Sequence, residues 1–129
     1  MSETEQLVRA IVKGIEEKKG EEIVGLDFSK VDNAVCEYFI ICHGNSKIHV
    51  NAVAESVEET VKKDVNDVAL HREGYENAQW ILLDYVNVVV HIFQNEYRAF
   101  YDLENLWGDA GTIDRKKLLS YGKKKKIAN

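Results

Sequence analysis

The sequence lacks the features that mark membrane-spanning, exported and multidomain proteins. Its apolar runs are short, such as residues 88–90, and fall far below the ~20 residues that a membrane span needs. The first five residues, MSETE, are acidic, whereas a secretory leader starts basic and transit peptides avoid acids. There is no proline and no internal repeat. A chain of 129 residues that is 45% hydrophobic and 30% charged therefore fits one ordinary soluble domain.

Cysteine is also scarce, with Cys36 and Cys42 the only two. Both fall on one predicted strand, where six residues span ~20 Å, too far for a disulfide. The apolar neighbours of Cys36 should raise its thiol pKa, which predicts an inert side chain rather than a nucleophile. Two free thiols and no export leader predict a reducing, cytoplasmic location.

Charge is distributed unevenly along the chain. Residues 111–129 contain seven basic residues and one acid, Asp114, a net charge of +6. Because the whole chain carries −5, residues 1–110 carry −11. An acidic body suits a basic protein partner better than wide contact with nucleic acid. We expect one domain over residues 1–110 and a basic, flexible, solvated tail over residues 111–129, with contact to a polyanion as the alternative.

Hydrophobic periodicity predicts two helices and two strands in the first half of the chain. A helix is expected over residues 4–19, ending before Gly20, and a strand over residues 22–28. Residues 35–42 read as a strand that is apolar on both faces, which is typical of a central position in a sheet. A second helix should begin near Ser46, or Asn45, either of which can cap it.

The second half predicts a short strand, a hairpin and a third helix. The strand covers residues 68–72, and the hairpin joins residues 80–85 to residues 87–93, with Asn87 adopting the left-handed conformation of a tight turn. The helix covers residues 95–107 and places four residues on one face: Tyr97, Phe100, Leu103 and Trp107. This order predicts an α/β (α+β) fold, with a mixed sheet of about five strands flanked by helices.

One stretch, residues 80–109, carries a specific resemblance. It combines Trp-three-apolar-Asp, a Val-Val-Val-His strand, and Arg-x-Phe-Tyr-x-Leu-Glu-x-Leu-Trp. This combination resembles the ribosomal silencing factor (Iojap) family, and the likeness extends back through residues 40–46, 49–50 and 73–74. The family usually has Gly-Asp at the hairpin turn, where this chain has Val86-Asn87. The resemblance covers roughly residues 5–109.

The resemblance implies a nucleotidyltransferase-like shape and a binding protein that is not an enzyme. It implies binding to the large ribosomal subunit through ribosomal protein L-fourteen, which sterically blocks the small subunit and represses translation. No cofactor and no metal are implied. A homodimer when free and a minor contact of the tail with ribosomal RNA remain possible additional interactions.

An enzyme is the alternative, because nucleotidyltransferases share that shape. Such enzymes follow a Gly-Ser turn with two carboxylates on a neighbouring strand, which hold magnesium. Here Gly44-Asn45-Ser46 resembles the turn, but the next acids, Glu55, Glu58 and Glu59, lie on a predicted helix. We therefore expect a structural turn and no catalytic metal site, since shape without the site gives no activity.

The four histidines do not form a metal-binding pattern either. None of His43, His49, His71 and His91 has the spacing of a zinc site. The best acid–base candidate is His91 with Asp84 across the hairpin, but no nucleophile or phosphate-binding loop accompanies the pair. We expect the pair to orient other groups or to contact a partner.

Trp80 is the strongest candidate for partner binding. It shares a strand face with Leu82 and Asp84, and Trp dominates protein-interface hot spots, although a core position would be equally common. In the family that this chain resembles, this Trp belongs to the ribosome-binding surface. We therefore expect the surface to comprise Trp80, Leu82 and Asp84 with His71 and Arg72 of the neighbouring strand. Trp107 is expected to be a core residue or a homodimer contact.

Overall fold

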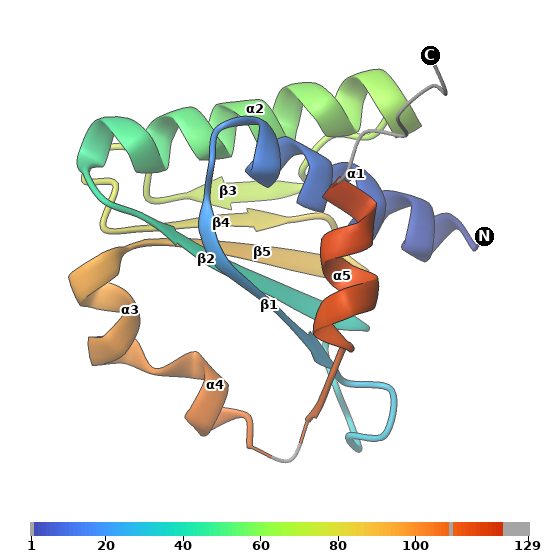
Figure 1. Cartoon of the computed structure of the whole chain (residues 1–129). Helices are drawn as coiled ribbons and strands as arrows, with labels where there is room; N and C mark the ends of the chain where they lie inside the picture. The colour runs from blue at the N-terminus through green and yellow to red at the C-terminus, as the bar shows by residue number, and fades with distance from the viewer. Residues whose placement is uncertain (1, 109, 123–129) are drawn as a thin grey trace.

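The computed structural model describes residues 2–108 and 110–122, and it confirms a mixed sheet flanked by helices (Figure 1). The strand order is β3-β4-β5-β2-β1-β6, with β2 and β5 parallel and the other neighbours antiparallel. The strands are β1 (Glu21–Asp27), β2 (Tyr38–Gly44), β3 (His71–Glu73), β4 (Trp80–Asp84), β5 (Val88–Gln94) and β6 (Gly111–Thr112). The helices are α1 (Glu3–Glu17), α2 (Lys47–Val65), α3 (Asn95–Tyr101), α4 (Leu103–Leu106) and α5 (Arg115–Gly122).

Helices α1, α2 and α5 cover one face of the sheet and form the larger core (Figure 1). Ser2 caps α1 by accepting from the backbone N–H of Glu5. Ser46, one of the two predicted caps, caps α2 by accepting from the backbone N–H of His49. The two helices touch closely at Gly14, where an added Cβ would lie 2.7 Å from the Cα of Val57. In the described part of the chain, no helix has the length and apolar character needed to cross a membrane.

The opposite face of the sheet carries α3, α4 and a second, smaller core (Figure 1). The strands supply this core by alternation: Phe39 and Ile41 from β2, and Val89 and Phe93 from β5, point away from α1 and α2. Leu103 of α4 closes it from outside. The central strands β2 and β5 are therefore buried on both faces, which explains why they read as continuous apolar runs.

The prediction of a single helix over residues 95–107 is wrong, because the helix is interrupted at residue 102. Asp102 adopts a left-handed conformation (φ 47°, ψ 52°) and separates α3 from α4. Phe100 and Leu103, expected on one helix face, differ in burial: Phe100 is 77% exposed and Leu103 is buried. The chain therefore turns back along the sheet instead of continuing as one straight helix.

The start of β2 and the hairpin turn also differ from expectation. Strand β2 begins at Tyr38 rather than residue 35, and Val35 is 84% exposed in the preceding loop. At the hairpin turn the left-handed residue is Val86 (φ 75°), not Asn87. Asp84 stabilises this turn, since its Oδ1 accepts from the backbone N–H of Val86 at 2.8 Å. The predicted pairing of the two strands is confirmed.

The segment after residue 110 also differs from the expected solvated tail. Residues 111–112 form β6, which pairs with β1 and makes the sheet six-stranded. Helix α5 then packs against α1 through Leu118, which is 1% exposed. Burial of this apolar side chain contributes favourable free energy that holds an otherwise basic segment against the body of the protein. The run of lysines at 123–126 lies outside the described residues.

Candidate functional site

Strand β4 lies second from one edge of the sheet and presents half-buried side chains on the face opposite α1 and α2. Its burial alternates: Ile81 and Leu83 are fully buried towards the helices, while Trp80, Leu82 and Asp84 are partly exposed on the other face. The three residues expected to share a surface therefore do so. This alternation follows from the period of two along a strand.

Trp80 is held in a fixed orientation by aromatic neighbours and one hydrogen bond. Its ring stacks on that of Phe93 of β5, with the ring centroids 5.0 Å apart. It also contacts the ring of Tyr101 of α3, with the centroids 4.7 Å apart. Its indole Nε1–H donates to Nδ1 of His91 at 3.0 Å. A rigid, partly exposed Trp loses little conformational entropy on binding, which is the property of a good interface anchor.

His91 is a buried support for Trp80 and not an acid–base partner of Asp84. In the register of the hairpin it lies opposite Leu82, and its ring is 3% exposed between the strands and Phe39. Burial lowers its pKa to about 3, so the ring is neutral and, since Nδ1 accepts from Trp80, its proton is on Nε2. Among the described residues Nε2 has no hydrogen-bond partner. His91 and Asp84 are therefore not bonded to each other: His91 orients Trp80, and Asp84 accepts from the backbone of Val86.

The structure separates His71 from Arg72. His71 lies directly opposite Asp84 in the β3–β4 register, on the face of Trp80, and its Nε2 contacts Oε1 of Glu73 at 2.7 Å. Arg72 pairs with Leu83 and therefore points to the other face, where its Nη1 lies 3.1 Å from Oε1 of Glu58 on α2. The expectation that Arg72 joins Trp80 is corrected, because consecutive strand residues face opposite sides.

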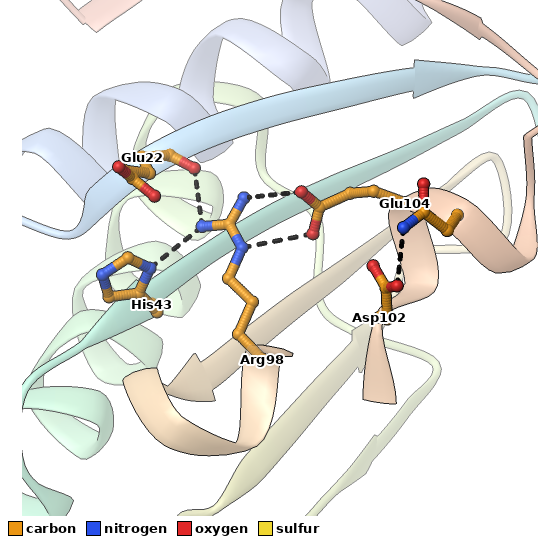
Figure 2. A network of polar contacts seen from close by, with 6 residues as sticks. Glu22, His43, Arg98, Asp102 and Glu104 are labelled. Carbon is orange, nitrogen blue, oxygen red and sulfur yellow. Dashed lines mark hydrogen bonds and ion pairs between the residues drawn. The ribbon is translucent and has the colours of Figure 1, made fainter. Parts of the chain in front are cut away.

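Arg98 forms a polar network that sequence reasoning did not assign (Figure 2). Its guanidinium contacts both carboxylate oxygens of Glu104, at 3.2 and 3.4 Å, and thus ties α3 to α4. It also donates to the backbone oxygen of Glu22 at 2.8 Å and lies 3.0 Å from Nδ1 of His43. Burial and the nearby Arg98 lower the pKa of His43, which keeps that ring neutral as an acceptor. The sequence feature that points to this network is the motif Arg-x-Phe-Tyr-x-Leu-Glu, in which Glu104 follows Arg98 by six residues.

Helices α3 and α4 extend the aromatic surface beyond β4. Trp107 is 38% exposed and packs edge-on against Phe28 and Phe39 of the smaller core, so its ring covers that core from the surface. Tyr101 is 42% exposed and Leu106 69% exposed. We name the combined face, comprising Trp80, Leu82, Asp84, His71 and the exposed side chains of α3 and α4, the aromatic face. An apolar patch of this kind on a sheet face is typical of a binding surface.

The two thiols and the Glu58 carboxylate, which could have been catalytic, are at least partly buried or bound to neighbouring side chains. Burial raises the pKa of the Cys36 thiol to about 11 and that of Cys42 to about 12, so both thiols are protonated at neutral pH. Glu58 of the helix that follows the Gly-Asn-Ser turn binds Arg72 and the hydroxyl of Tyr75. In residues 2–108 and 110–122, no three His, Cys, Asp or Glu side chains gather in a way that could hold a metal ion.

The fold and the aromatic face together define a class of small α/β domains that offer a rigid aromatic surface on one side of a mixed sheet. The family described as "ribosomal silencing factor during starvation" matches residues 1–129. The chain therefore belongs to the ribosomal silencing factor family, and the resemblance drawn from residues 80–109 is confirmed.

Individual relatives agree with this assignment. The chain is 36% identical over 116 residues to a ribosomal silencing factor of Halalkalibacterium halodurans, which covers 90% of this chain and 97% of that protein. It is 37% identical over 109 residues to the Bacillus subtilis protein of the same name, covering 84% and 90% of the two chains. A chloroplastic Iojap protein of Zea mays is 35% identical over 77 residues, 60% of this chain and 33% of that one.

Solved structures confirm the fold. A crystal structure from Chromobacterium violaceum superimposes with a TM-score of 0.77 at 33% identity, covering 84% of this chain and 88% of the other. A second, from Bacillus halodurans, gives a TM-score of 0.74 at 34% identity, covering 85% and 98%. The expected α/β fold with a mixed sheet is therefore confirmed.

Proposed function

We propose that this protein represses translation by binding the large ribosomal subunit through ribosomal protein L-fourteen and occupying space that the small subunit needs. The observation that carries the proposal is the family match over the whole chain, together with relatives named ribosomal silencing factors. The proposed action is steric, so it needs no cofactor and no catalytic residue. The proposed location is the cytoplasm.

The proposed contact surface is Trp80, Leu82 and Asp84 of β4, with His71 beside them. Trp80 supplies the apolar anchor, because Phe93, Tyr101 and His91 already hold its ring in place. Asp84 supplies charge: one carboxylate oxygen stabilises the hairpin turn, and the other is available to a basic residue of the partner. The acidic body, −11 over residues 1–110, also favours encounter with a basic protein.

A binding measurement with purified L-fourteen tests this surface. Trp80→Ala should weaken binding by about 2 kcal/mol or more, roughly thirtyfold, if Trp80 is a hot spot. The matched control is Ile48→Ala, which removes a side chain that is 81% exposed on α2 at the opposite face of the sheet and should bind as the wild type does. Circular dichroism and a thermal melt establish that both variants are folded. Unchanged affinity in a folded Trp80→Ala variant would refute the proposed surface.

A further inference from the structure

A basic segment lies at the edge of the sheet far from the aromatic face. Strand β6 is the edge strand next to β1, whereas β3 is the opposite edge strand and β4 lies next to it. Helix α5 follows β6 and begins with Arg115, Lys116 and Lys117, all of them exposed. The positive charge of residues 111–122 is therefore carried at a place distinct from Trp80.

Packing fixes the direction in which these basic side chains point. Leu118 is 1% exposed in the main core, and Leu119 and Tyr121 pack against the same core beside α1 (Figure 1). The apolar side of α5 is thus occupied by the body of the protein. Its basic side remains for solvent or for a partner.

The acidic groups near α5 affect its three basic residues differently. Lys117 borders a cleft with Glu5, Asp27 and Asp114, and its charge acts on Tyr38, so nearby carboxylates offset much of its field. Within the described residues, by contrast, no carboxylate lies within ion-pairing distance of Arg115 or Lys116. These two residues are the part of α5 that is free to bind an external anion.

Two physical arguments identify the class of partner. Stable binding to a lipid surface is favoured by an apolar helix face that inserts, and the apolar face of α5 is already buried; charge alone contributes only a modest free energy per basic residue at an anionic membrane. A nucleic-acid backbone requires only clustered positive charge, because each neutralised phosphate releases counterions. The sequence adds four lysines at 123–126, outside the described residues, but the argument rests on α5.

We propose that the exposed basic side of α5 binds the phosphate backbone of ribosomal RNA, as a second contact separate from the aromatic face. This inference rests on the proposed function, which brings the protein to the ribosome. The contact reads charge and not base sequence, because contacts of arginine and lysine to phosphates carry no sequence information directly. It would orient the bound domain by holding it at the two opposite edges of its sheet.

The test measures binding of the full chain to a fluorescein-labelled RNA hairpin with a stem of about 20 base pairs, by fluorescence anisotropy across a KCl series. The variant is Arg115→Gln with Lys116→Gln. The control, Lys30→Gln with Lys47→Gln, removes the same charge from two exposed sites elsewhere. Loss of two phosphate contacts should reduce the slope of log affinity against log salt by about 1.4 to 1.8, so affinity falls ~10-fold less between 50 and 200 mM KCl.

Identical slopes for the α5 variant and the control would overturn the inference. Equal binding of the wild type to vesicles of four parts phosphatidylcholine and one part phosphatidylserine would overturn the assignment to RNA. Salt-dependent sedimentation with large subunits separates this inference from the proposed function. Trp80→Ala reports the protein contact through a loss of binding at every salt concentration, whereas the α5 variant reports the RNA contact through a change of slope alone.

Discussion

Removal of the Arg98 guanidinium should destabilise the protein substantially, because that group connects four otherwise separate segments. It joins Glu104 of α4, the backbone oxygen of Glu22 in β1 and the ring of His43 in β2 to its own helix α3. Arg98→Met keeps the aliphatic stem and deletes these contacts. The variant therefore tests the network without creating a large cavity.

The expected magnitude follows from burial on each side of the ion pair. Removing one partner of a buried pair costs roughly 3–5 kcal/mol, since the other charge is left without compensation. The Arg98 side chain is 9% exposed, but that of Glu104 is 35% exposed and recovers part of its hydration. We therefore expect a loss of about 2–4 kcal/mol in the free energy of unfolding.

Urea denaturation followed by circular dichroism measures this loss as a lower midpoint with an unchanged slope. The control is Lys13→Met, which breaks the Lys13–Asp64 pair, whose side chains are 40% and 27% exposed. An exposed pair contributes about 1 kcal/mol or less. If Arg98→Met costs no more than Lys13→Met, the network does not hold α3 and α4 in place.

Two further predictions concern the core. Leu118→Ala should lower the free energy of unfolding by about 2–4 kcal/mol, because the side chain is 1% exposed. A thermal melt that matches the wild type would contradict the assignment of residues 111–122 to the folded domain. The buried His91 has a pKa lowered to about 3, so only the unfolded chain takes up a proton, and stability should fall as pH drops from about 6.5 towards 3. His91→Phe should reduce that slope by up to about 1.4 kcal/mol per pH unit in urea titrations, and parallel wild-type and variant curves would refute it.

The sequence predicts well where local chemistry decides the structure. Strand alternation in β4 correctly grouped Trp80, Leu82 and Asp84, and the hydroxyl of Ser46 marked the start of α2. The same alternation, applied to β3, would have separated His71 from Arg72, because neighbours on a strand face opposite sides.

Other differences have tertiary causes that local patterns do not contain. No glycine or proline marks the break at Asp102, and the ion pair between Arg98 and Glu104 closes that corner only in the folded chain. The sequence of α5 looks like a solvated basic segment because it is rich in lysine, yet Leu118 is buried and holds the segment against the body of the protein. The hydrogen bond from Trp80 to His91 likewise depends on the hairpin register, and composition gives no sign of it.

Sedimentation of the purified protein with isolated large subunits, followed by addition of small subunits, tests the proposed silencing most directly. The account predicts that the protein travels with the large subunit and that fewer complete ribosomes form. At the same protein concentration, less of the folded Trp80→Ala variant should travel with the large subunit, and subunit joining should be reduced less. A wild-type protein that stays at the top, or that binds large subunits without reducing their joining, would contradict the account.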